Sequence, residues 1–273
     1  MPKAHPTNHH EAKLRKAGHR LIAGVDEAGK GSWAGPLVTA AVILDETDVP
    51  AELYDSKMLT PKQRERVFVA ITKTALAWTA HVVPVTEIDK EGVHKANLQA
   101  LKRAVEKLHI SPDAVLVDAF KIDLGATPVI NIIDGDALER SISAASIIAK
   151  VVRDQIMSSE LNRQYPKFHF HVHKGYGTPL HAKLLAMHGP TLAHRMSFAP
   201  VQAAAQKASK KFIANKKKPT IFNKAKPTRH TSSRSIVGKP KKHVIQTKKL
   251  KKSIKKKAAR GPKRTKKRTA HKR

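Results

Sequence analysis

The feature that most constrains the fold of this chain is the separation of its charge from its apolar residues. Of the 53 Lys and Arg in 273 residues, 28 lie within residues 206–273, where there is no Asp or Glu. Apolar residues are too sparse there to bury a core, and like charges repel one another. We therefore expect residues 206–273 to form a disordered basic tail that binds nucleic acid, and residues 1–18 to form a flexible polar leader.

Residues 19–205 have the length and mixed composition of one folded domain. Within residues 1–205 there are 25 Lys and Arg against 21 Asp and Glu, so the strong positive charge belongs to the tail. The longest mostly apolar stretch, residues 33–44, has only 12 residues and contains Pro36. It is too short to span a membrane, and the N-terminus lacks the apolar run of a signal peptide. We expect a monomeric, cytoplasmic protein without membrane contact.

Apolar runs of strand type alternate with helical patterns along this domain. Residues 21–25 and 37–44 are apolar runs on either side of a glycine-rich turn, which predicts a hairpin. Further strands are predicted at residues 78–85, 114–117 and 129–133, and helices at residues 61–76, 93–108, 138–157, 179–188 and 191–195. The predicted fold class is α/β, with a mixed β-sheet flanked by helices and a helical C-terminal portion.

Four acidic residues stand where predicted strands end. Asp26 and Glu27 follow the first strand, Asp118 ends the run AVLV, and Asp136 follows the run VINII. Because the chain has no Cys, any metal must be bound by carboxylates or His. A solvated turn is the simpler interpretation of an isolated Asp-Glu pair. Two more acids at strand ends instead favour a site for Mg²⁺ or Mn²⁺, which prefer oxygen ligands.

Gly29, Lys30 and Gly31 form the glycine-rich turn that follows the first acidic pair. The segment GVDEAGK nearly matches a phosphate-binding P-loop, but Gly31 stands where that motif has Ser or Thr. Two acids also lie where such a loop would wrap anionic phosphates. We interpret the segment as a turn whose glycines let backbone amides approach a substrate closely.

A series of segments, in order along the chain, resembles ribonuclease HII. They include GVDEAGKGSWAGPLVTAAVIL (24–44), YDSKMLT (54–60), NLQALKRAV (97–105), VLVDA (115–119), SAASIIAKVVRD (143–154), HKGYGT (173–178) and HRMSFAPV (194–201). The resemblance covers roughly residues 21–201. It implies an RNase H-like mixed sheet with a C-terminal helical extension, in agreement with the predicted elements. Ribonuclease HIII is disfavoured, because residues 1–18 are too short for the extra N-terminal domain of that family.

The resemblance also implies an activity and a catalytic site. The expected enzyme is an endonuclease that cleaves 5′ to a ribonucleotide, in RNA/DNA hybrids or embedded in duplex DNA, and leaves 3′-hydroxyl and 5′-phosphate ends. Asp26, Glu27, Asp118 and Asp136 would be the catalytic metal ligands. Two Mn²⁺ or Mg²⁺ ions there would activate water and neutralise the leaving 3′-oxygen.

Residues beside the carboxylates are expected to contact the substrate. The resemblance places the turn Gly29-Lys30-Gly31 and the hydroxyl of Tyr176 at the ribose 2′-hydroxyl. Lys30 stands where the family has Arg, which keeps the charge but loses the planar five-donor guanidinium. A tyrosine at the edge of the core is the alternative interpretation of Tyr176. Candidate phosphate contacts are Ser56, Lys57, Lys150 and Lys174.

Other titratable residues are interpreted as structural. Asp55 is expected to orient the loop after it, and Asp154 to form a structural pairing on a helix beside Arg153. His169, His171 and His173 alternate, as they would on one face of a strand, and such spacing can bind Zn²⁺. With 16 His scattered through the chain, we interpret this stripe as accidental or facing nucleic acid.

A non-catalytic protein that packages nucleic acid is the alternative function. The tail, rich in Lys, Ala and Pro, resembles that of a linker histone, and such a tail would bind polyanions without sequence selectivity. The four intact acids of the domain argue instead for an enzyme that carries a basic tail.

Overall fold

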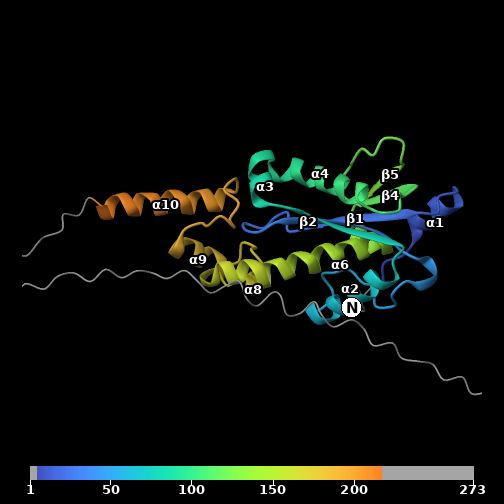
Figure 1. Ribbon diagram of the computed structural model, residues 1–273, viewed down its shortest axis with the longest axis horizontal. Coiled ribbons are helices and arrows are strands. Elements are labelled where there is room, and N and C mark those ends of the chain that lie inside the picture. Colours follow the sequence, from blue (N-terminus) through green and yellow to red (C-terminus); the bar gives the residue numbers. More distant parts are fainter. Residues whose placement is uncertain (1–4, 217–273) are drawn as a thin grey trace, which may run out of the picture. The chain divides into compact units, whose positions relative to one another are not determined.

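The computed structural model describes residues 5–216 and contains a five-stranded mixed sheet (Figure 1). The strands are β1 (Ile22–Ala28), β2 (Leu37–Ile43), β3 (Ala77–Val83), β4 (Ala114–Asp118) and β5 (Val129–Ile132), in the spatial order β3-β2-β1-β4-β5. The pairs β1–β2 and β2–β3 are antiparallel, whereas β1–β4 and β4–β5 are parallel. The C-terminal ends of β1, β4 and β5 therefore meet at one edge of the sheet.

Helices cover both faces of this sheet (Figure 1). They are α1 (His9–Lys16), α2 (Pro61–Thr74), α3 (Val85–Glu91), α4 (Val93–Glu106), α5 (Gly135–Leu138), α6 (Arg140–Gln155), α7 (Asn162–Gln164), α8 (Phe170–His173), α9 (Pro179–His188) and α10 (Ala199–Lys216). Short segments η1 (Glu46–Asp48), η2 (Ile156–Leu161) and η3 (Pro166–Phe168) complete the described elements. Side chains of α2 and α6 pack on one face and those of α4 on the other. Alternate residues of β2 supply the two faces, as the two-residue period of a strand requires.

The buried helix α6 lies unusually close to β1. A Cβ atom on Gly24 would stand 2.0 Å from the backbone carbon of Ser141, so only glycine fits at this crossing. At the same end of α6, the Ser141 amide donates to the Glu11 carboxylate at 2.8 Å. An acceptor at the first turn of a helix satisfies one of its free amides, so Glu11 anchors α1 to α6.

The sequence-based prediction of the sheet is confirmed, including the hairpin of β1 and β2. Two predicted elements nevertheless differ. The stretch 191–195, expected to be helical, forms turns, and its His194 bridges to Ala34. The alternating histidines do not lie on a strand, because His169 has φ 52° and begins the short helix α8. The rings of His169 and His171 lie 5.9 Å apart and are exposed, whereas His173 is buried, so the three do not share one face.

The prediction that residues 1–18 form a flexible leader is wrong for much of this segment. The amide of Thr7 donates to the Leu138 carbonyl at 2.7 Å, and the Arg140 amide donates to the Thr7 carbonyl at 3.0 Å. Leu14 of α1 is buried in the core against β1 and β4. These tertiary partners hold a segment whose own composition predicts no stable fold.

The expected boundary of the tail also shifts. Residues 206–216 continue the helix α10, so the prediction of disorder is wrong for them. Residues 217–273 lie outside the described residues. Among the helices that the structure describes, none is both long and apolar enough to cross a membrane.

Candidate active site

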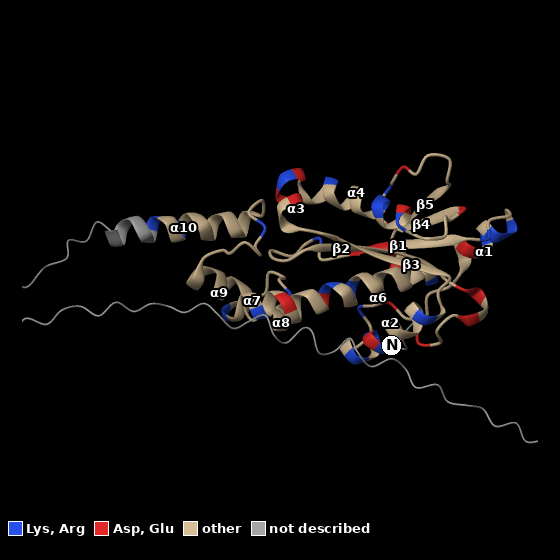
Figure 2. Cartoon of the chain, viewed as in Figure 1, with Lys and Arg blue, Asp and Glu red and all other residues tan. Residues whose placement is uncertain are grey.

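The four acids predicted from strand ends line one cavity of about 300 Å³. Asp26 and Glu27 lie near the C-terminal end of β1, Asp118 ends β4, and Asp136 lies in α5 just after β5. Figure 2 shows acidic residues on β1, within the sheet. The cavity is lined by Asp26, Glu27, Ala28, Gly29, Lys30, Gly31, Ser56, Lys57, Arg64, Asp118, Asp136, Ser146, Lys150 and Tyr176.

Backbone amides orient two of these carboxylates. Asp26 accepts a hydrogen bond from the Glu27 amide at 2.7 Å, and Asp118 accepts one from the Gly135 amide at 2.7 Å. Gly135 also lies against Ile142, where an added Cβ would stand 2.6 Å from the side chain. The glycine after β5 thus lets its backbone reach the carboxylate at the end of β4.

Three of these carboxylates, Asp26, Glu27 and Asp118, are set in surroundings that oppose their ionisation. Burial raises the pKa of Asp26 well above its usual value, and the charges of Glu27 and Asp118 raise it further. Burial likewise raises the pKa of Glu27 to about 7, against the opposing charge of Lys30. Burial, together with the charge of Asp136, raises the pKa of Asp118. Converging acids with raised pKa values are typical of functional sites.

The donor chemistry fits a hard divalent cation. Glu27 Oε2 is buried, and no described residue is found to donate a hydrogen bond to it, so it has a lone pair free for a ligand. A cation would remove the repulsion that raises the pKa values, and oxygen ligands suit Mg²⁺ or Mn²⁺. Among the described residues, however, no three His, Asp or Glu side chains are already arranged to hold a metal ion. Binding of a cation by these side chains would therefore require them to move closer together.

Lys57 forms an ion pair with one of these carboxylates. Its ammonium donates to Asp136 Oδ2 at 2.7 Å, and its backbone amide donates to Asp55 Oδ1 at 2.8 Å. Asp55 therefore orients the loop, as expected from the sequence. Next to it, Ser56 Oγ lies 2.9 Å from Ser146 Oγ of α6, which fixes the loop to the helix.

The other basic candidates differ in position. The Lys30 ammonium lies 3.9 Å from the centroid of the Phe120 ring. Lys150 lines the cavity and donates to Asp154 at 2.8 Å, so the structural pairing of Asp154 is with Lys150 and not with Arg153. Lys174 does not line the cavity. Its ammonium donates to Ser158 Oγ and to the His171 carbonyl.

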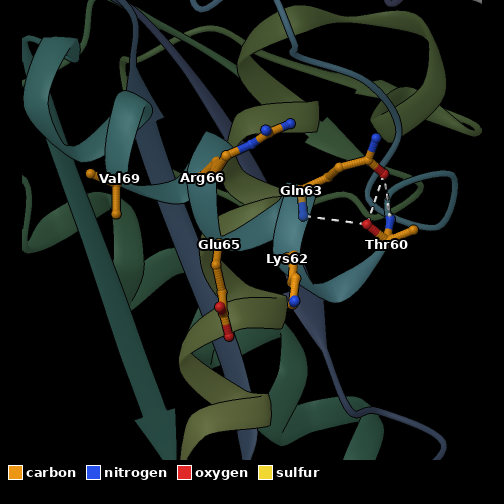
Figure 3. A pocket seen from close by; sticks show the side chains of 6 residues that line it. All are labelled: Thr60, Lys62, Gln63, Glu65, Arg66 and Val69. Atoms are coloured by element: carbon orange, nitrogen blue, oxygen red, sulfur yellow. Dashed lines mark hydrogen bonds between the residues drawn. The ribbon is translucent and has the colours of Figure 1, made fainter.

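Besides Ala28, two polar residues of the cavity were not predicted from the sequence. Ser146 lies four residues before Lys150 on α6, and this helical spacing is the signal that could have identified it. Arg64 of α2 donates to the Ser56 carbonyl at 2.8 and 3.0 Å, and nothing local in the sequence indicates that contact. A larger hollow of about 870 Å³ lies along α2, but Glu65 is its only acid (Figure 3).

Comparisons with known proteins agree on one family. A family model described as Ribonuclease HII matches residues 23–201. Ribonuclease HII of Rhodococcus erythropolis is 44% identical over 196 residues, which are 71% of this chain and 86% of that protein.

Solved structures agree with this result. Ribonuclease H2 from Pyrococcus horikoshii OT3 superposes with a TM-score of 0.62 and 27% identity, over 70% of this chain and all of that one. Bst-RNase HIII in complex with Mn²⁺ has a TM-score of 0.54 at 21% identity, over 72% of each chain, a likeness of fold alone.

Proposed function

We propose that this chain, which belongs to the ribonuclease HII family and is a ribonuclease H, cleaves the phosphodiester bond on the 5′ side of a ribonucleotide. The substrates would be RNA/DNA hybrids and duplex DNA with embedded ribonucleotides, and the products would have 3′-hydroxyl and 5′-phosphate ends. The observation that carries the proposal is the single cavity in which carboxylates from three strand ends face a glycine-rich turn. We further propose that the chain acts as a monomer in the cytoplasm.

The carboxylates would serve as metal ligands in this reaction. Asp26, Glu27, Asp118 and Asp136 are proposed to hold two divalent cations, which would lower the pKa of the attacking water and neutralise the leaving oxygen. The amides of Glu27 and Gly135 hold two of the ligands in place. Mn²⁺ or Mg²⁺ suits this oxygen donor set. Since no Cys is present, a cysteine nucleophile plays no part.

Recognition of the ribose is assigned to the turn at residues 29–31 and to Tyr176. Both line the cavity, and a Cβ on Gly31 would have no neighbour within 4 Å, so a substrate can come close to this backbone. The 2′-hydroxyl is the group that distinguishes ribose from deoxyribose. Ser56, Lys57 and Lys150 are proposed to contact phosphates, and Lys174 is left out because its side chain does not line the cavity.

The test is nicking of a DNA duplex that contains one ribonucleotide, with and without Mg²⁺ or Mn²⁺. Asp26→Asn and Asp118→Asn are expected to lower the single-turnover rate by at least about 10²-fold, because a lost metal ligand removes several kcal/mol of transition-state stabilisation. Binding of the duplex is expected to stay largely intact. Asp123→Asn, an exposed acid outside the cavity, is the matched control. A near wild-type rate for Asp118→Asn would refute the assignment.

A further inference from the structure

Two fully buried arginines lie behind the glycine-rich turn. The side chains of Arg153 on α6 and Arg195 after α9 are both 0% exposed. In the described part of the chain, neither forms an ion pair with a carboxylate, and Asp154 pairs with Lys150 instead. Burial of an unpaired charge costs several kcal/mol, so a fold retains it only where dense hydrogen bonding or a function offsets that cost.

Arg153 donates almost entirely to backbone carbonyls. Its Nε donates to the Pro36 carbonyl at 3.0 Å, and its Nη2 to the Ala34 carbonyl at 3.2 Å and the Lys174 carbonyl at 3.0 Å. The same Nη2 donates to Ser32 Oγ at 2.7 Å. One guanidinium therefore joins the loop after β1 to the loop that carries the proposed ribose-binding tyrosine.

Arg195 holds the same loop at two other carbonyls. Its Nε donates to the Gly35 carbonyl at 3.0 Å, and its Nη1 to the Lys30 carbonyl at 2.9 Å. The carbonyl of Lys30 is thus drawn inward. Within the described residues, the amides of Lys30 and Gly31 donate to no protein acceptor, and both residues line the cavity.

The glycine at the start of the turn is explained by this arrangement. Gly29 has φ +89°, and an added Cβ would stand 1.9 Å from Arg153 Nε. The guanidinium therefore packs directly on the backbone of the turn. In addition, Arg153 Nη1 and Arg195 Nη2 are buried and find no acceptor among residues 5–216, so the pair has more hydrogen-bond donors than this part of the chain uses.

We propose that Arg153 and Arg195 are positioning residues for ribose recognition, which hold the carbonyls of the loop inward and so present the amides of Lys30 and Gly31 to the substrate. This inference rests on the proposed function, since it assigns the substrate contact of the same cavity. The guanidinium fork is essential to it, because a lysine cannot donate to two carbonyls in a fixed plane.

The central experiment uses Arg195→Lys, which keeps the charge and loses the fork. We expect kcat/KM for a duplex with one ribonucleotide to fall about tenfold, which is about 1.4 kcal/mol. The inhibition constant of an all-deoxy duplex as competitor should stay within about twofold. Leu101→Ala, on the core-facing side of α4, is the control for lost stability, and all assays are run where circular dichroism shows folded protein. Equal losses for both duplexes would show that Arg195 is merely structural.

A second readout does not depend on cleavage. In ¹⁵N-labelled wild-type protein without divalent cations, the amide signals of Lys30 and Gly31 should shift when the ribonucleotide duplex is added, and these shifts should shrink in Arg195→Lys. If that variant does not fold, Ser32→Ala removes the hydroxyl that accepts from Arg153 and donates to the Gly29 carbonyl, and it leaves both charges in place. It should give a selective loss of about threefold, and unchanged selectivity would overturn the proposal. A wild-type protein that cleaves no ribonucleotide duplex would instead overturn the proposed function.

Discussion

The ammonium of Lys57 lies 2.7 Å from Oδ2 of Asp136, and the two side chains differ greatly in exposure. The lysine is 72% exposed and the carboxylate only 4%. This hydrogen bond raises the pKa of Lys57. The ammonium of an exposed side chain thus pairs with a buried carboxylate of the site.

This pairing predicts that Lys57 competes with divalent cations. Lys57→Gln should raise the affinity of the substrate-free protein for Mn²⁺ by about threefold to tenfold, in line with the ~1 kcal/mol of a partly exposed ion pair. Isothermal titration calorimetry measures this directly. Lys62→Gln on α2, whose side chain lies in the hollow of Figure 3 away from the four acids, is the control. A lower Mn²⁺ affinity in Lys57→Gln would contradict the competition.

Alanine substitutions at two glycines near the site should have opposite effects, one on catalysis and the other on stability. Gly31→Ala should change the free energy of unfolding by less than about 0.5 kcal/mol, because its Cβ would meet nothing within 4 Å. It should still lower kcat/KM for the ribonucleotide duplex by about tenfold to hundredfold, since the Cβ would displace the substrate from the backbone. Urea unfolding and steady-state kinetics test both parts, and unchanged kinetics would show that no substrate approaches this turn.

Gly24→Ala is the matched substitution on the inner side. Its Cβ would stand 2.0 Å from the backbone of Ser141, where α6 cannot move without losing its packing on β1. We expect a loss of about 3 kcal/mol or more in the free energy of unfolding. A fully stable Gly24→Ala protein would mean that α6 shifts easily, contrary to the packing described above.

The acidic edge of the sheet could be predicted because its signals are local. Asp118 directly follows an apolar run, and the chemistry of a carboxylate at a strand end needs no knowledge of distant residues. The docking of α1 could not be predicted, because Glu11 is stabilised by a residue 130 positions away. The same holds for Arg153 and Arg195, whose partners are, apart from the Ser32 hydroxyl, backbone carbonyls that carry no sequence signal. The alternation of His169, His171 and His173 suggested a strand, but the positive φ of His169 precedes a short helix instead.

A buried histidine cluster predicts how stability depends on pH. The Nδ1 of His181 lies 2.9 Å from the carbonyl of Tyr176, so it must donate, and Nδ1 of His194 accepts from the amide of Thr191 at 3.0 Å. The Nε2 atoms of the two rings lie 3.1 Å apart, and the neutral tautomer of His194 donates there. Burial lowers the pKa of His181 to about 4 and that of His194 to about 3.

Because these pKa values lie below that of an ordinary histidine, the unfolded chain binds protons at a higher pH than the folded protein does. Below about pH 6.5, each of the two histidines should cost about 1.4 kcal/mol of stability per pH unit until its own folded pKa is reached. The raised pKa values of Asp26 and Glu27 act in the opposite direction. The test is therefore the difference between wild type and His194→Gln, measured by urea unfolding from pH 7.5 to 4.5. As the pH falls, the free energy of unfolding of the variant should decrease less steeply than that of the wild type, by the slope of about one proton. Parallel curves would disprove the assignment.

The last prediction concerns the basic segment beyond α10. Residues 217–273 contain 24 Lys and Arg and no Asp or Glu, and α10 before them carries Lys but no acid (Figure 2). Removal of residues 217–273 leaves α10 whole, which a cut at residue 206 would not. We expect the truncated protein to cleave at the wild-type single-turnover rate when enzyme is saturating, because no residue of the cavity is removed.

Binding of nucleic acid by the truncated protein, in contrast, should depend much less on salt concentration than binding by the full chain. Each phosphate neutralised by a protein cation contributes about −0.9 to the slope of log K against log salt concentration. If six to ten of the 24 cations engage a duplex at once, affinity of the full chain should fall by roughly 10³ to 10⁵ between 50 and 200 mM salt. The truncated protein should have a much shallower slope on duplexes with and without a ribonucleotide, because phosphate contacts carry no sugar selectivity. Equal slopes for the two proteins would exclude the segment as a DNA anchor, and a reduced single-turnover rate would place it in the catalytic step.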